Sequence, residues 1–353
     1  MNGIPAIEVN FANGHRDNLV LERFYSSDEE RKMKSPSCNF LGHLAKEETA
    51  CVAVSGCLGD KMEMTIMSKH NALSNMYIWH KDGHVQVVES AFKDPRVKSE
   101  TMRLEDDWTL VGSDELENPE LVAGELAAAE QCASGGDCNQ MPASQLMEIK
   151  IGYDDNFAES FDSAAEIETY LNSMVVHVQA HFCLDSLGTK IQLERVGDLT
   201  HHENQRWKAK TKFLRRMRRI IKRDETGADL YVFLTKDEQY YGTVGIAWVG
   251  TLCLPTWPGS ECGITEKRNT VLETAEIVTH EMGHNLGMFH DFDSLHEGTG
   301  CDGTGFMSYG THPYEWSTCS VSDFLASYNY KQNQGFEWCL DELATACGGS
   351  KNL

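Results

Sequence analysis

Alternating apolar and polar positions mark short strands in the first third of the chain. The clearest examples are residues 6–11 and 62–67, and turn-forming Asn-Gly and Asp-Gly pairs follow at 13–14 and 82–83. Side chains that change face at every residue fit half-buried antiparallel strands joined by tight turns. The first part of the chain is therefore predicted to be β-rich.

Strand and helix patterns alternate in the rest of the chain. Strands are expected at 147–151, 190–195, 230–234 and 244–249, and amphipathic helices at 164–181 and 207–222. This alternation favours an α/β sandwich. Residues 121–143 are rich in Ala, Gly and Ser, as an exposed connector would be. The prediction is two domains, 1–143 and 144–353.

Charge and composition exclude several classes of function. The net charge of −23 disfavours binding to nucleic acid or to an anionic membrane surface. The longest weakly polar run, 243–255, is shorter than the roughly 20 residues of a membrane span. Twelve cysteines without a C-x-x-C pair favour disulfides and an oxidising compartment. The first residues do not resemble a secretory signal, so we expect an incomplete N-terminus or another export route.

The strongest chemical signal is HEMGHNLGMFHD at residues 280–291, which matches H-E-x-x-H-x-x-G-x-x-H. On a helix, His280 and His284 lie one turn apart on one face. Gly287 can adopt a left-handed conformation that ends the helix and returns His290 to the same ion. Three imidazoles suit a catalytic zinc with an open fourth position for water. Glu281 is then expected to be the general base for that water.

With these residues, the chain resembles the metzincin metallopeptidases, and Asp291 points to the adamalysin (reprolysin) branch. CDGTGFMSY at 301–309 is similar to the family's Met-turn, with Met307 beneath the ligands. WSTCS at 316–320 and EWCLD at 337–341 resemble the secreted branch that carries thrombospondin motifs. The resemblance implies a mixed, mostly parallel sheet with helices and zinc at the cleft, preceded by a β-rich propeptide domain. It also implies a secreted zinc metalloendopeptidase that acts on matrix or secreted polypeptides bound along residues 242–253.

The same resemblance suggests further site residues. The implied disulfides are Cys183–Cys262, Cys253–Cys339 and Cys301–Cys319, with Cys347 unassigned. Glu148, Asp229 and Asp341 occupy positions of calcium-binding carboxylates, although ordinary surface charge is an alternative for all three.

The N-terminal region resembles the corresponding propeptide at residues 8–19 and 40–59. The family often keeps itself latent by placing a propeptide thiolate on the zinc, for which Cys132 and Cys138 are the nearest candidates. A disulfide between them is the alternative. No Arg or Lys lies between Arg103 and Lys150, so a basic cleavage site is absent there. The alternative function is a latent or non-proteolytic binding protein whose propeptide is not released.

The remaining histidines and basic residues are assigned structural roles. His177 and His181 are four apart on a predicted helix but have no third ligand, so they are expected to pack. His201, His202, His296 and His312 are expected at the surface or in the substrate cleft. Residues 206–223 are predicted to form a helix with a solvated basic face, and glycan binding stays open there as a secondary property.

Overall fold

The structure is a computed structural model. It describes residues 7–11, 14–26, 38–56, 61–70, 74–80, 85–88, 98–102, 139–199, 205–207, 211–236, 243–293, 296–301, 305–308 and 315–344. Within these residues the chain forms two seven-stranded sheets, which we call the N-terminal sheet and the central sheet.

The N-terminal sheet is an antiparallel meander in which each strand pairs with the next along the chain. Its strands are β1 (Ile7–Asn10), β2 (Arg16–Arg23), β3 (Asn39–Leu44), β4 (Glu47–Ser55), β5 (Lys61–Met67), β6 (Asn75–His80) and β7 (Val85–Val88). The period-two pattern predicted β1 and β5 closely. The predicted β-rich N-terminal region is confirmed.

The central sheet has the order β10-β9-β11-β13-β12-β8, with β14 paired to β9. Its strands are β8 (Lys98–Met102), β9 (Ser144–Tyr153), β10 (Lys190–Asp198), β11 (Leu230–Thr235), β12 (Thr243–Trp248), β13 (Cys262–Glu266) and β14 (Asp341–Glu342). All pairs are parallel except β12 with β13 and β14 with β9. The predicted mixed, mostly parallel sheet is confirmed.

The helices agree with the periodicity, with one shifted start. They are α3 (Asp155–Ala158), α4 (Ala164–Phe182), α5 (Thr211–Ile221), α6 (Val271–Leu286) and α7 (Thr318–Asn333), with a short 3-10 turn η4 (Asp185–Leu187). The predicted helix at 207–222 begins only at Thr211. Trp207 lies before it because its backbone N–H donates to the Asp154 carboxylate.

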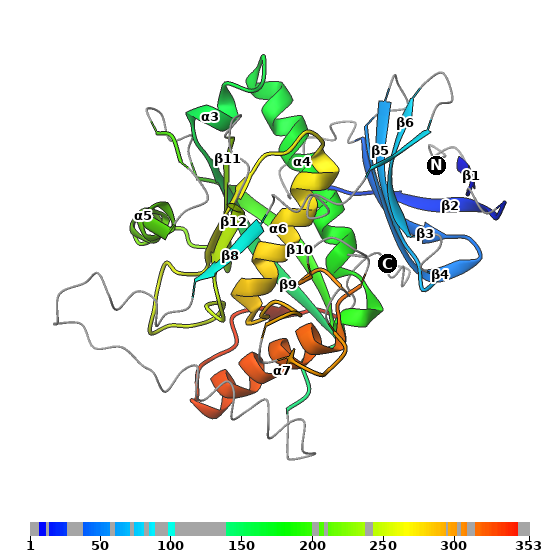
Figure 1. Cartoon of the computed structure of the whole chain (residues 1–353). Helices are drawn as coiled ribbons and strands as arrows, with labels where there is room; N and C mark the ends of the chain where they lie inside the picture. The colour runs from blue at the N-terminus through cyan, green and yellow to red at the C-terminus, as the bar shows by residue number, and fades with distance from the viewer. Residues whose placement is uncertain are drawn as a thin grey trace.

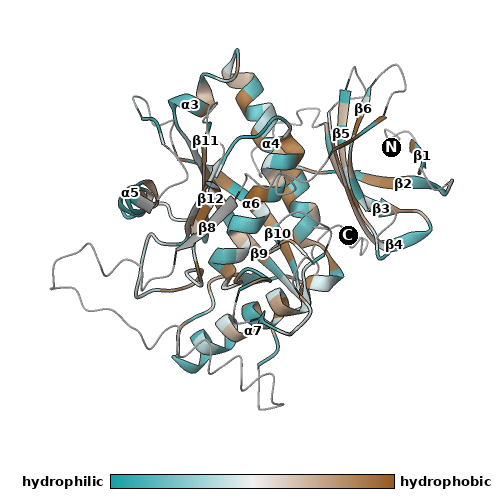
Figure 2. Ribbon diagram, viewed as in Figure 1, coloured by the Kyte–Doolittle hydropathy of each residue, from teal (hydrophilic) through white to brown (hydrophobic). Residues whose placement is uncertain are grey.

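The elements form layers (Figure 1). The N-terminal sheet packs on α4, α4 and α6 cover one face of the central sheet, and α5 lies on the opposite face. Apolar residues concentrate in the central strands and on the buried sides of the helices (Figure 2). In the described part of the chain, no helix combines the length and apolar character that a bilayer span requires.

One buried histidine joins the N-terminal sheet to α4. The His177 ring bonds to the Ser55 hydroxyl through Nε2 and to the Thr65 hydroxyl through Nδ1, both at 2.9 Å. Ala53 and Met67 of the same sheet belong to the apolar core that also contains α4 and α6. The N-terminal region is therefore packed onto the remainder of the chain. Residues 121–138 of the expected connector lie outside the described residues, so the boundary at 143 stays a prediction.

One of the three expected disulfides is not formed. Cys253–Cys339 and Cys301–Cys319 are present. The expected Cys183–Cys262 pair is wrong, because Cys262 is a free thiol and Cys183 is bonded to another cysteine. Cys262 packs with α5 on one face of the central sheet and Cys183 packs with α4 on the other, so the sheet separates them. Cys132, Cys138 and Cys347 lie outside the described residues.

Candidate metal centre

Helix α6 carries the motif, and its sequence fixes both ends. At the start, the Thr270 hydroxyl accepts from the Glu273 backbone N–H at 3.1 Å, and the Glu273 carboxylate accepts from the Thr270 N–H at 2.9 Å. This reciprocal capping box satisfies amides that have no partner within the helix.

Gly287 ends the helix with φ 108°, a left-handed conformation that favours glycine. A Cβ at this position would also lie 2.5 Å from the Ser327 Cβ, so a side chain has no room there. The chain turns at this point, and the Met288 N–H returns to the Gly283 carbonyl at 3.0 Å. The glycine therefore redirects the chain toward His290.

Three buried imidazoles converge at the end of this turn. The ring centroids of His280, His284 and His290 lie 4.7, 4.8 and 5.2 Å apart. One nitrogen from each ring lies within 4.8 Å of the others. Among the described residues no other trio of His, Cys, Asp or Glu ligand atoms is gathered in this way.

The hydrogen bonds of two rings show that a cation fits between them. Nδ1 of His280 donates to the Phe306 carbonyl at 2.7 Å, and Nδ1 of His284 donates to the Met288 carbonyl at 2.8 Å. Burial lowers the pKa of His280 to about 4 and that of His284 well below its usual value, so both rings are neutral. Their Nε2 atoms then face each other with lone pairs at 3.1 Å. A shared metal ion satisfies both, and the donor set is consistent with zinc.

The Glu281 side chain extends from α6 onto β12 and β13 of the central sheet. A Cβ built on Gly245 of β12 would fall 1.9 Å from Glu281 Oε1, and one on Gly263 of β13 would lie 3.2 Å from its Cβ. Both neighbours must be small because the glutamate packs directly on these two strands. The expected base is thus held beside β12, the strand at which substrate was expected.

Met307 packs against the ligand-bearing helix. A Cβ on Gly283 would lie 2.6 Å from the Met307 sulfur, and Met307 is fully buried. Gly283 lies between His280 and His284 in the chain, so this thioether supports the helix at the level of both ligands.

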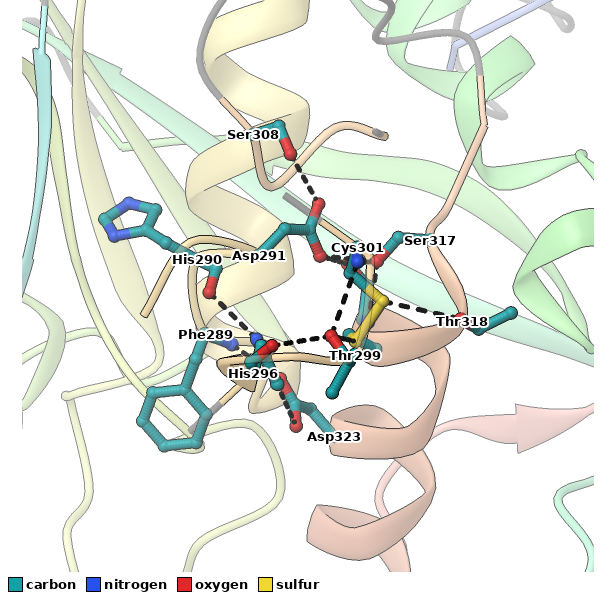
Figure 3. The surroundings of a disulfide bond; sticks show 12 residues. Phe289, His290, Asp291, His296, Thr299, Cys301, Ser308, Ser317, Thr318 and Asp323 are labelled. Carbon is teal, nitrogen blue, oxygen red and sulfur yellow. Dashed lines mark hydrogen bonds and ion pairs between the residues drawn. A yellow bond between two sulfur atoms is a disulfide. The ribbon is translucent and has the colours of Figure 1, made fainter. Parts of the chain in front are cut away.

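Asp291 ties the end of the motif to the Met-turn and to α7 (Figure 3). Its carboxylate accepts from the hydroxyls of Ser308 at 2.8 Å, Ser320 at 3.2 Å and Ser317, while its N–H donates to the Met307 carbonyl at 3.1 Å. Burial raises the pKa of Asp291, and the three serine hydroxyls oppose that rise. The residue after the third histidine therefore has a positioning role.

His296 and Asp323 hold the loop that carries His290, a role that the sequence analysis missed (Figure 3). His296 Nδ1 donates to the His290 carbonyl at 2.9 Å, and its Nε2 lies 3.2 Å from Asp323 Oδ1. Asp323 Oδ2 also accepts from the Phe289 N–H at 3.0 Å. His296 is buried, so the expected surface position is wrong. The sequence offered no local signal, because Asp323 lies 27 residues further along the chain.

The three acidic residues considered for calcium, Glu148, Asp229 and Asp341, are close to one another but less tightly gathered than the three imidazoles. Asp229 Oδ2 accepts from the Glu148 N–H at 2.8 Å. Burial raises the pKa of Asp229 to about 6, and the charges of Glu148 and Asp341 add to the rise.

The two helical histidines predicted to pack are buried in α4. His177 bonds to two hydroxyls, and His181 Nδ1 bonds to Thr279 Oγ1 at 2.6 Å. His201, His202 and His312 lie outside the described residues.

The outer edge of β12 is already paired. Strand β8 from the N-terminal region runs parallel to it, with Glu100 opposite Ile246 and Met102 opposite Trp248. The edge at which we expected a substrate strand therefore carries a segment of the chain itself.

Comparisons with known proteins agree with this geometry. The family model described as metallo-peptidase family M12, of the reprolysin type, matches residues 143–333. The human disintegrin and metalloproteinase domain-containing protein 9 is 40% identical over 84 residues, which are 24% of this chain and 10% of that protein. The human protein named a disintegrin and metalloproteinase with thrombospondin motifs 6 is 34% identical over 116 residues, 31% of this chain and 10% of that protein.

The matched segments thus span about a tenth of each relative, whereas the family model covers more than half of this chain. The buried histidine cluster lies within the span of the model. The chain therefore belongs to metallopeptidase family M12.

Proposed function

We propose that the chain is a zinc-dependent endopeptidase of the secreted adamalysin branch, which cleaves extracellular polypeptides. The observation that carries this proposal is the convergence of three buried imidazoles on α6 and its following turn, with Glu281 on the same helix beside β12. The similarity to a human protein with thrombospondin motifs supports the choice of branch.

His280, His284 and His290 would hold the zinc through ring nitrogens. When bound, the ion supplies a Lewis acid that polarises the scissile carbonyl and makes water more acidic. Glu281 accepts a proton from the attacking water and passes it to the leaving amine. The Nδ1 bonds to Phe306 and Met288 carbonyls keep two rings oriented through this cycle.

The substrate is proposed to be an extended polypeptide that adds to the edge of β12. Backbone hydrogen bonds would hold such a peptide in register, and side-chain pockets would select among sequences. Glu281 packs on Gly245 of this strand, so a peptide at the edge would lie next to the base.

The pairing of β8 with β12 favours a latent state of this same enzyme. A peptide cannot add to β12 while β8 occupies that edge, so removal of the N-terminal region would be required for cleavage. Contact of Cys132 or Cys138 with the zinc is a second proposed element of latency, and a disulfide between the two is its alternative. If the N-terminal region is never released, the chain would act as a binding protein with a closed site.

Two further features belong to the proposal. Glu148, Asp229 and Asp341 would bind calcium, for which carboxylate oxygens are suitable ligands. The disulfides Cys253–Cys339 and Cys301–Cys319 support a place in the secretory pathway or outside the cell.

The test is release of the N-terminal region after folding. A cleavage site for a specific protease is inserted within residues 104–138, and peptide cleavage and zinc content are measured before and after the cut. We expect one zinc per chain in both states and chelator-sensitive cleavage only after the cut.

The matched control is the same protein with Glu281→Gln, which should bind zinc and stay inactive after the cut. Zinc binding without cleavage of any peptide library, once the N-terminal region has been removed, would contradict the enzyme and support the binding protein.

A further inference from the structure

Half of the residues between Asn204 and Arg223 are basic. This stretch contains 10 of the 31 Lys and Arg residues of the chain and no Asp or Glu, although the chain has 54 acidic residues. Helix α5 occupies most of it. The concentration of one charge in a strongly acidic protein needs an explanation beyond solubility.

The apolar side of α5 is buried. Leu214, Met217 and Ile221 are buried against the central sheet together with Trp248 and Ile264. Their spacing of three and four residues defines the buried side of the helix. The basic side chains therefore lie on the remaining surface, and α5 is mostly hydrophilic outside this contact (Figure 2).

Four cations form a straight row on that surface. Lys212, Arg216 and Arg219 of α5, with Arg223 just beyond its end, are spaced by four, three and four residues and are all exposed. At 1.5 Å per residue, the row is about 16 Å long. Arg215, Arg218 and Lys222 flank it.

The row has no carboxylate partners within the described part of the chain. Lys150, Arg195 and Arg206 form ion pairs with carboxylates, whereas the four cations of the row do not. Like charges three or four residues apart on a helix repel each other and destabilise it. Bound sulfate groups would relieve this repulsion, and guanidinium groups bind oxyanions through two parallel N–H donors.

The row faces away from both other functional surfaces. The N-terminal sheet, α4 and α6 lie on the opposite face of the central sheet from α5 (Figure 1). A ligand bound along α5 would therefore contact neither the histidine cluster nor the N-terminal sheet. Among the residues that the structure describes, neither the N-terminal sheet nor the histidine cluster lies on this face.

We propose that the row on α5 binds a linear sulfated polysaccharide and tethers the protein through it. The disulfides indicate an oxidising compartment, which favours a sulfated glycan over nucleic acid as the partner. An anionic membrane is disfavoured because the apolar side of α5, which would have to enter the lipid, is buried.

The test measures retention of the full chain on immobilised heparin across a salt gradient. The wild type should be retained at about 0.15 M salt, and its affinity should fall steeply as salt rises. A triple variant should no longer be retained at that salt; it carries Lys212→Gln, Arg216→Gln and Arg219→Gln. By analogy with phosphate contacts, they should reduce the slope of log affinity against log salt by about one per cation.

The matched control removes three exposed cations from the N-terminal sheet and its turns, with Lys46→Gln, Lys61→Gln and Lys69→Gln. Both triple variants have a net charge of −26 instead of −23, so total charge cannot explain a difference between them. The control should elute with the wild type. The circular dichroism spectrum should be unchanged in both variants.

Arg216→Lys with Arg219→Lys gives a second measurement that keeps the charge of the row. It should weaken binding several-fold without abolishing it, because the paired N–H donors are lost. Equal shifts in the two triple variants, or a wild type that passes through heparin at 0.15 M salt, would overturn the proposal. Equally tight binding to double-stranded DNA or to phosphatidylserine vesicles would overturn the assignment to a sulfated glycan.

Discussion

Two pairs of histidines in this protein have the same spacing on buried helices and opposite roles. His177 and His181 lie on α4, and His280 and His284 lie on α6. All four rings have pKa values lowered mainly by burial. The difference lies in their hydrogen bonds, because both nitrogens of His177 bond to hydroxyls while the α6 rings donate through Nδ1 to carbonyls. The same spacing on a helix therefore does not by itself identify a pair of metal ligands.

Removing a ligand from the second pair should have the largest effect. His284→Ala is expected to abolish stoichiometric zinc binding and all peptide cleavage by the cut enzyme. The matched change in the first pair, His181→Gln, should leave one zinc per chain. Atomic absorption measures the zinc content of both variants. Equal zinc loss in the two would show that the histidine pairs do not differ in role.

Glu281→Gln separates chemistry from metal binding. Loss of a general base typically costs about 10²- to 10⁴-fold, so kcat/KM of the cut enzyme should fall by that factor. Zinc affinity should be unchanged because the three imidazoles are intact. Full activity in this variant would rule out the proposed base.

His177→Ala tests the first pair as a packing element. The change leaves the Ser55 and Thr65 hydroxyls buried without their ring partner and opens a cavity. The free energy of unfolding should therefore fall by about 2–4 kcal/mol. Zinc content should not change. Denaturant unfolding measures the loss, with the exposed His70→Ala as a control expected within about 0.5 kcal/mol of wild type. A fall in zinc content would instead mean that His177 supports the metal centre.

Asp323→Asn tests whether His290 depends on its supporting loop. We expect zinc affinity to fall about tenfold, because partners of metal ligands typically contribute 10- to 100-fold. Chelator competition measures this, and a changed visible spectrum of the cobalt-substituted protein would report altered geometry at the ion. Glu297→Gln, an exposed change in the same loop, should have neither effect. If both variants behave alike, the loop contact has no role in positioning.

The smallest effect is expected at Asp229. Because its folded pKa of about 6 lies above the ordinary value, the native state binds more protons than the unfolded state between about pH 4 and 6. Its contribution to stability is therefore present below that window and lost as the pH rises through it. Asp229→Asn should melt about 2–4 °C above wild type at pH 7 without calcium. At pH 4 the variant and the wild type should melt at the same temperature. Calcium should stabilise only the wild type at pH 7, and a calcium response in the variant would exclude Asp229 as a ligand.

The parts of the site that the sequence predicted are local in the chain. The ligand spacing and the turn at Gly287 both act within one helix and the loop after it. The strands β9 and β11 and the helix α4 were also predicted, because burial imposes a regular apolar period on each.

The parts that were missed depend on contacts between distant residues. Asp291 meets Ser308, Ser317 and Ser320, and His296 meets Asp323, across 17 to 29 residues that show no periodic signal. The expected Cys183–Cys262 pair failed for the same reason, since the central sheet that separates the two thiols is formed by strands from several parts of the chain.

The sequence alone determined which residues can bind a metal and how they are spaced on one helix, because ligand type and helical geometry are local properties. Only the tertiary structure decided which imidazoles converge, which cysteines meet, and that β8 covers the edge of β12. Each of these depends on burial and hydrogen-bond partners that come from elsewhere in the fold.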